Sequence, residues 1–203
     1  TRPALAEIHA YRKAVDAAVA DFIHESPAQD FARAAPLVEL GLHHEQQHQE
    51  LMLTDILHLL SLNPLRPAAL DMPALRRPAA EAGWIEHPGG EIGIGHAGAA
   101  FAFDNETPRH AVRLQPFALA NRLVTNGEYQ RFIDDGGYTQ PGLWLSDGLA
   151  AVQTSGWRAP LYWLDDGTEF TLNGVVPRDA DAPVCHLSFY EAAAYAEWSG
   201  ARL

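Results

Sequence analysis

The sequence is organised around residues 42–51, which read LHHEQQHQEL. This stretch places two imidazoles, His44 and His48, one helical turn apart. Side chains at that spacing project from the same helix face, with Cβ atoms roughly 6 Å apart. Two histidines in this arrangement can bind one metal ion. The stretch therefore predicts two ligands of a metal site on a helix.

Leucine and histidine side chains, followed by one aspartate, recur around this stretch at steps of three and four residues, the period of one helix face. The positions are Leu37, Leu40, His44, His48, Leu51 and Asp55. We expect a helix from Phe31 or Pro36 to about Leu60, with the two histidines on its buried face. Glu50 lies roughly 200° around such a helix from His48, so it cannot easily bind the same metal ion. We expect it to support a metal ligand from outside the coordination sphere or to contact another helix.

The same residues leave other interpretations open. Isolated buried histidines are usually hydrogen-bonded core residues. Residues 44–48 also spell H-E-x-x-H, in which Glu45 would be the general base of a zinc peptidase. The longer metzincin signature needs a glycine and a histidine where this chain has Leu51 and Thr54. That mismatch argues against a metzincin, but it leaves a peptidase with a later glutamate ligand open.

The composition limits the class of partner. The 203 residues include 26 acidic and 14 basic side chains, a formal net charge of -12. This charge disfavours a nucleic-acid backbone or an anionic membrane as partner. No apolar run of about eighteen residues is present that would cross a bilayer. We therefore expect small-molecule partners, with neither nucleic acid nor membrane.

The one cysteine and the two ends of the chain carry further expectations. Cys185 can form no internal disulfide, which fits a reducing cytoplasm, and we expect it to be a buried strand residue. The chain begins at Thr1 without an initiator methionine and stops at Leu203 just after a helix-ending signal. We therefore expect it to be a region of a longer protein.

Changes in composition predict three regions. Residues 1–63 are rich in Ala and Leu, with a first amphipathic helix over 5–23, and are typical of part of a helical bundle. Prolines within 64–83 predict a linker. Residues 84–203 combine glycines, tryptophans and short alternating segments, which predict an α+β domain.

Local signals predict elements within residues 84–203. Residues 84–94 predict a hairpin around Pro-Gly-Gly, and residues 110–119 predict one strand. Capping boxes at Thr125 and Ser188 predict two short helices. Between these helices we expect a long irregular stretch, in which aromatic side chains form the core in place of regular structure. These side chains are Trp144, Trp157, Tyr162 and Trp163.

Several of these motifs resemble one known family. Residues 44–58, HEQQHQELMLTDILH, resemble the metal-binding helix in the DinB-like domain of ergothioneine-type sulfoxide synthases. Residues 103–110 (FDNETPRH), 119–129 and 144–148 are similar to the formylglycine-generating-enzyme-like domain of the same enzymes. The resemblance covers nearly the whole chain in order. It implies an α+β protein: part of a DinB-like helical bundle, followed by part of a formylglycine-generating-enzyme or C-type-lectin-like α+β domain.

The resemblance also implies a chemistry. These enzymes use Fe(II) and O2 to join a thiol, from γ-glutamylcysteine or cysteine, to C2 of the imidazole of hercynine (Nα-trimethylhistidine), leaving a sulfoxide. It implies that His44 and His48 are two of three iron ligands, that Gln47 contacts hercynine, and that Arg2 binds the thiol's carboxylate. It places the third ligand on an earlier helix and the catalytic tyrosine beyond Leu203. We therefore expect the chain alone to be inactive.

Three other functions remain as alternatives. They are a zinc peptidase using His44, Glu45 and His48, a zinc-dependent thiol transferase of the wider DinB-like class, and a helical bundle joined to a lectin-like binding domain. Residues 84–203 favour the synthase, because neither a peptidase nor a transferase would require this second region. His58 lies near the stripe of His48, where it could support a metal ligand, and we expect it to be a capping or core residue instead.

Overall fold

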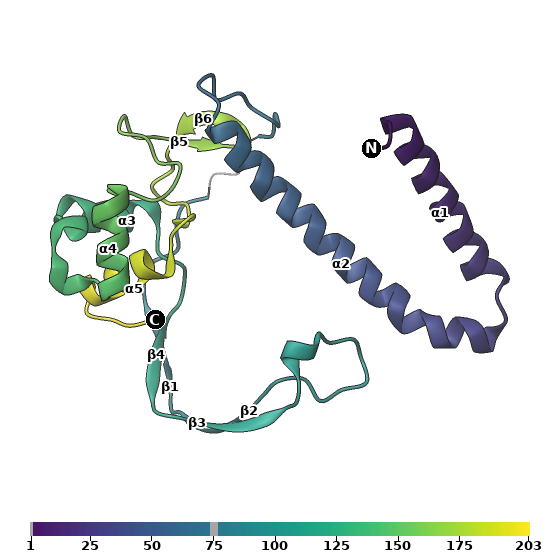
Figure 1. Cartoon of the computed structure of the whole chain (residues 1–203). Coiled ribbons are helices and arrows are strands. Elements are labelled where there is room, and N and C mark those ends of the chain that lie inside the picture. The colour runs from purple at the N-terminus through teal and green to yellow at the C-terminus, as the bar shows by residue number, and fades with distance from the viewer. Residues whose placement is uncertain (1, 74–76) are drawn as a thin grey trace. The chain divides into compact units, whose positions relative to one another are not determined.

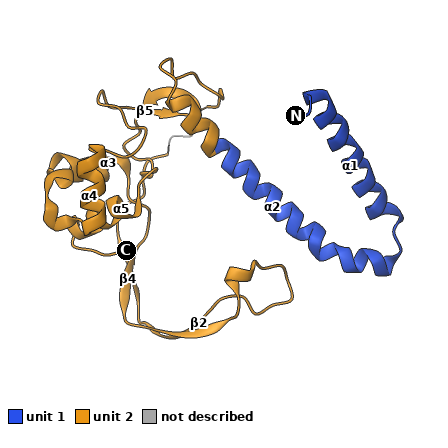
Figure 2. Cartoon of the chain, in the orientation of Figure 1, with its two compact units in different colours: residues 1–53 blue, residues 54–203 orange. Residues whose placement is uncertain are grey.

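The structure is a computed structural model that describes residues 2–73 and 77–203. The chain divides into two compact units, residues 1–53 and 54–203, and the boundary lies inside a long helix (Figures 1 and 2). None of the described helices is long and apolar enough to cross a membrane.

Two long helices form the first part of the chain. They are α1 (Leu5–Glu25) and α2 (Ala28–Ser61), which confirms both predicted helices, although α2 begins three residues before Phe31. The chain breaks between them at Ser26, whose backbone is extended (φ -68°, ψ 147°). The residue that follows is Pro27, and the residue before a proline is sterically pushed out of the helical conformation.

The expectation that the histidines lie on a buried face is wrong for this structure. His44 and His48 are exposed, and Leu37 and Leu51 of the same stripe are 71% and 53% exposed. Among the described residues, α1 has no buried side chain and α2 has only Leu57. A helix stripe becomes buried only where another element packs over it, and the described part of the chain places none over this one.

A two-stranded ribbon begins the second part of the chain. Strand β1 (Trp84–His87) pairs antiparallel with β4 (Phe117–Ala120), and β2 (Gly90–Ile94) pairs antiparallel with β3 (His110–Leu114). Figure 1 shows the two pairs following one another along the ribbon. The predicted hairpin around Pro-Gly-Gly is therefore wrong, because β1 and β2 pair with later strands and not with each other.

The predicted single strand over residues 110–119 is also divided, at Gln115 and Pro116. Proline has no N–H to donate to a strand ladder, so it interrupts the pairing. Gly89 lies opposite this break with φ +71°, and a Cβ there would come within 2.5 Å of Leu114 O. The ribbon can cross the break only with a glycine at that position.

A compact core holds the rest of this unit together. It is built by α3 (Asn126–Asp134), α4 (Ser146–Ser155) and α5 (Phe189–Trp198), with the short 3₁₀ turns η2 (Gly137–Thr139) and η3 (Pro141–Leu143). A further 3₁₀ turn, η1 (Asp104–Glu106), lies between β2 and β3. The core side chains are Tyr129, Phe132, Tyr138, Trp144, Val152 and Ala194.

Both predicted capping boxes are confirmed. The Thr125 hydroxyl accepts a 3.2 Å hydrogen bond from Glu128 N, and the Ser188 hydroxyl accepts one of 3.2 Å from Glu191 N. Each glutamate in turn accepts from the backbone N–H of its capping residue, at 2.9 Å and 2.8 Å. These bonds satisfy N–H groups that the first helical turn leaves unpaired.

The stretch expected to be irregular contains regular structure. Helix α4 and the hairpin of β5 (Thr168–Thr171) and β6 (Gly174–Pro177) both lie in it. The segment that follows α2 is hydrogen-bonded to the turn of this hairpin: Ala69 N and Leu70 N both donate to Leu172 O. The expectation for Cys185 is wrong as well: it is exposed and lies outside the strands.

Candidate functional site

His44 and His48 of α2 lie side by side in the structure. Their ring centroids are 4.5 Å apart and their planes are inclined at 77°, so the edge of one ring faces the other. This adjacency follows from the helix, which brings side chains four residues apart onto one face. Among the described residues, no group of three or more His, Cys, Asp or Glu side chains could hold a metal ion. The pair therefore supplies at most two protein ligands.

The other predicted site residues are also exposed. Gln47 and Glu50 lie on α2, and Arg2 lies just before α1. Within the described residues, no hydrogen bond or ion pair joins any of these three side chains to the histidine pair. The structure thus brings together His44 and His48 and does not bring Arg2 into contact with them.

Glu45, the alternative general base, lies within electrostatic reach of α1. The pKa of Arg12 is raised, mainly by its 2.8 Å hydrogen bond to Asp16 and by the charge of Asp16, and further by the Glu45 carboxylate.

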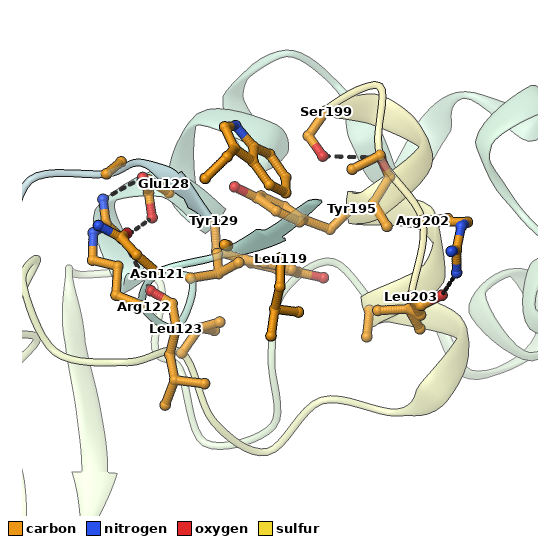
Figure 3. Close-up of a pocket in the computed structure, with 18 of the residues that line it drawn as sticks. Leu119, Asn121, Arg122, Leu123, Glu128, Tyr129, Tyr195, Ser199, Arg202 and Leu203 are labelled. Atoms are coloured by element: carbon orange, nitrogen blue, oxygen red, sulfur yellow. Dashed lines mark hydrogen bonds and ion pairs between the residues drawn. The ribbon is translucent and has the colours of Figure 1, made fainter. Parts of the chain in front are cut away.

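A pocket of about 360 Å³ opens in the second unit. Its walls are mainly apolar, and they come from residues 82–84, 118–129 and 184–203. Figure 3 shows Arg122 and Glu128 at one end of the pocket, and Arg202 and Leu203 at the other. No local sequence signal could have revealed this pocket, because its walls are up to 121 positions apart in the chain.

Two of the charged groups of the pocket, Arg122 and Glu128, are paired with each other, and Arg202 donates a 3.1 Å hydrogen bond to the backbone oxygen of Leu203. Arg122 donates two 2.7 Å hydrogen bonds to the two oxygens of Glu128 and a third, of 2.8 Å, to Ala80 O. The Arg122 hydrogen bonds are the main reason that the pKa of Glu128 falls to about 2, assisted by the Thr125 backbone N–H. What the pocket offers a ligand is therefore chiefly apolar contact, with the Arg202 guanidinium at one end (Figure 3).

A third group of side chains lies within the second unit, at the C-terminal end of α2. His58 Nδ1 is 3.2 Å from Tyr162 Oη, and the ring of Tyr162 lies edge to face with that of His186, with centroids 4.8 Å apart. His58 is exposed. It is thus a surface side chain bonded to a residue 104 positions away, and the expectation of a capping or core role was wrong.

Comparison with known proteins identifies the part of the second unit that follows α2. Residues 72–203 match the family described as the sulfatase-modifying factor enzyme 1-like domain. The chain belongs to that family. We call residues 72–203 the FGE-like domain, and the predicted resemblance to formylglycine-generating enzymes is confirmed for this part.

Individual relatives extend the similarity to the helices. The chain is 37% identical over 199 residues to a hercynine oxygenase of Mycolicibacterium smegmatis, covering 97% of this chain and 45% of that protein. It is 40% identical over 162 residues to a hercynine oxygenase of Mycobacterium tuberculosis, covering 79% of this chain and 38% of that protein. A formylglycine-generating enzyme of Streptomyces coelicolor is 31% identical over 160 residues, covering 69% of this chain and 49% of that enzyme.

The predicted similarity to the hercynine oxygenase type of enzyme with an FGE-like domain is thereby confirmed. The chain spans less than half the length of each of these relatives. The assignment of the helices before the FGE-like domain to a DinB-like bundle, and the domain limits 1–63, 64–83 and 84–203, stay predictions.

Proposed function

We propose that the protein containing this chain is a sulfoxide synthase of ergothioneine biosynthesis that acts on hercynine, a thiol and dioxygen with iron(II) as cofactor. The observation that carries the proposal is the side-by-side pair of His44 and His48, with ring centroids 4.5 Å apart, in a chain 37% identical over 97% of its length to a hercynine oxygenase. The thiol is γ-glutamylcysteine or cysteine. The single cysteine among 203 residues fits a cytoplasmic location, which is part of the proposal.

The proposed reaction balances in atoms and electrons. A carbon–sulfur bond forms at C2 of the hercynine imidazole, while the C2–H and the S–H bonds break. One oxygen atom of O2 ends on sulfur as the sulfoxide, and the other leaves as water with the two hydrogens. The two substrates supply all four electrons that reduce O2, so no external reductant is needed.

The histidine pair fits iron(II) in donor type and in spacing. Neutral imidazole nitrogen is a common ligand of iron, and two such ligands from one helical turn leave coordination positions for a further ligand, substrates and oxygen. Bound iron(II) would supply the site at which the substrates and O2 meet. Because no third ligand lies among the described residues, we expect it from elsewhere in the protein.

The neighbouring side chains have separate roles in this proposal. Gln47 precedes His48 and is proposed to contact hercynine through its amide. Arg2 is proposed to bind the carboxylate of the thiol, since a guanidinium donates two parallel hydrogen bonds to a carboxylate. Glu50 is proposed to act behind the ligands, because residues two apart on a helix do not face each other.

The alternatives share the histidine pair but differ in metal and product. A peptidase or a thiol transferase would use zinc, with Glu45 as general base in the peptidase. The FGE-like domain favours the oxygenase, because proteins that share both parts of this chain in order carry the name hercynine oxygenase.

The test uses the full-length protein, with the variants His48→Ala and Gln49→Ala. The wild type is expected to bind iron stoichiometrically and to consume O2 only when hercynine and a thiol are both present. His48→Ala should lower turnover at least about 100-fold, since losing even a partner of a metal ligand typically costs 10–100-fold. Gln49→Ala, on a different side of the same turn, should retain activity.

Two outcomes would contradict the proposal. Stoichiometric zinc together with peptide cleavage would favour the peptidase. Full oxygenase activity of His48→Ala would remove His48 from the metal site.

A further inference from the structure

The aromatic cluster of His58, Tyr162 and His186 is held by unusual backbone. Tyr162 and His186 have φ of +75° and +60°, in the left-handed region that residues with a side chain avoid. The main chain of Leu161, next to Tyr162, is also joined to that of His186, because Leu161 N donates a 3.2 Å hydrogen bond to His186 O. Strained backbone of this kind persists only where the surroundings enforce it, and it concentrates at functional positions.

The strain has a geometrical result. Tyr162 O accepts a 2.9 Å hydrogen bond from Phe170 N of β5, which fixes the main chain of Tyr162 against the hairpin. With its backbone fixed there, the left-handed conformation directs the side chain across the ring of His186 to His58, 3.2 Å from the Tyr162 hydroxyl. Glycine at position 162 would relieve the strain there but would leave no side chain to reach α2.

The contact lies at the end of α2 that belongs to the second unit. Figure 2 shows the last turns of α2 in the colour of that unit, and Leu57, next to His58, is 7% exposed. The chain that follows α2 is also attached to the β5–β6 turn, where Asn173 Nδ2 donates a 2.8 Å hydrogen bond to Met72 O. The backbone of the following segment and the His58 side chain are therefore both attached to the FGE-like domain.

We propose that Tyr162 is a positioning residue: through its hydrogen bond to His58 it holds the C-terminal turns of α2, the helix that carries His44 and His48, on the FGE-like domain. The inference rests on the proposed function, in which α2 carries two ligands of the metal ion. Tyr162 touches neither metal nor substrate in this scheme, and it acts through His58 and α2.

The experiment uses the full-length protein and two independent measurements. Hydrogen exchange reports how firmly residues 54–61 are held, and steady-state kinetics report kcat and KM. The variant Tyr162→Phe keeps the ring and the backbone conformation but removes the hydroxyl. We expect exchange at residues 54–61 to rise about tenfold and kcat to fall about tenfold, with bound iron, KM and the unfolding midpoint unchanged.

Partner variants separate positioning from general stability. His58→Gln retains a side chain that can hydrogen-bond the phenol and should stay near wild type, whereas His58→Leu should match Tyr162→Phe. The double variant His58→Leu/Tyr162→Phe should be no worse than either single one, because both remove the same bond. Tyr190→Phe, which removes a hydroxyl from α5 in the same unit, should leave both measurements unchanged.

The two proposals fail in different ways. A wild-type protein that does not turn over hercynine and thiol would overturn the proposed function, while hydrogen exchange would still decide whether Tyr162 holds α2. Exchange at residues 54–61 that is unchanged in Tyr162→Phe would overturn the positioning role. So would additive losses in the double variant, or a fall in the unfolding midpoint that accounts for the whole loss of activity.

Discussion

The phenol of Tyr138 donates a 2.6 Å hydrogen bond to Oε1 of Glu191, and both side chains are buried. Glu191 is also the capping glutamate of α5, whose Oε2 accepts from Ser188 N at 2.8 Å. One carboxylate therefore joins a helix start to the core of the FGE-like domain. Burial is the main reason that the pKa of Tyr138 is raised, so its hydroxyl keeps its proton and remains a donor.

Replacing Glu191 should destabilise the FGE-like domain. Glu191→Ala removes a helix cap and the carboxylate that accepts from the buried Tyr138 hydroxyl, at a cost of about 2–4 kcal/mol in the free energy of unfolding. Glu191→Gln keeps an acceptor of the same shape and should cost about half as much. Tryptophan fluorescence during urea unfolding measures this, because all five tryptophans lie in the FGE-like domain. Equal losses in the two variants would contradict the dual role.

The ion pair of Arg122 and Glu128 should make the domain sensitive to acid. The pKa of Glu128 falls to about 2 in the folded state, below the ordinary 4.5 of a glutamate, chiefly through Arg122. A carboxylate with a lowered pKa stabilises the fold above its unfolded pKa, and this contribution is lost as the pH falls from about 4.5 to about 2. Glu128→Gln should lack this component of the acid dependence, which urea midpoints at pH 5 and pH 3 would reveal.

The helical glycine Gly148 should not tolerate a methyl group. A Cβ at this position would come within 2.6 Å of Tyr190 Cβ, which is too near the backbone to move aside. Gly148→Ala should therefore lower the free energy of unfolding by about 1–3 kcal/mol, although alanine is the better helix former.

Gly41 of α2 provides the matched control for Gly148. A Cβ there would meet no atom within 4 Å, so Gly41→Ala should stabilise its helix by about 0.5–1 kcal/mol. Thermal unfolding followed by circular dichroism distinguishes the two. A stabilising Gly148→Ala would show that α4 and α5 do not pack as closely as described.

Gln47 and Glu50 should affect catalysis differently under the proposed function. Gln47→Ala removes an amide proposed to contact hercynine, and should raise KM for hercynine about tenfold, the effect of a hydrogen bond worth about 1.4 kcal/mol. Glu50→Gln should leave that KM unchanged and weaken iron binding by about 10–100-fold. Kinetics at varied hercynine, with iron titrations, separate these roles. A reversed pattern would exchange the two assignments.

Much of the local structure could be predicted because its causes are local. The two long helices and the capping boxes at Thr125 and Ser188 follow from spacing within a few turns. The adjacency of His44 and His48 has the same origin, since a helix fixes it. The resemblance of the 103–110 motif to the FGE-like domain was also contained in the sequence.

Tertiary structure alone decided which strands pair and which side chains meet. Trp84 pairs with Ala120 and not with the nearby β2, and His58 meets Tyr162 across 104 positions. Whether the histidine face of α2 is covered was likewise undetermined, because covering depends on elements distant in the chain. The spacing of residues determines which side chains share one face of a helix or strand. The packing between elements determines what that face contacts.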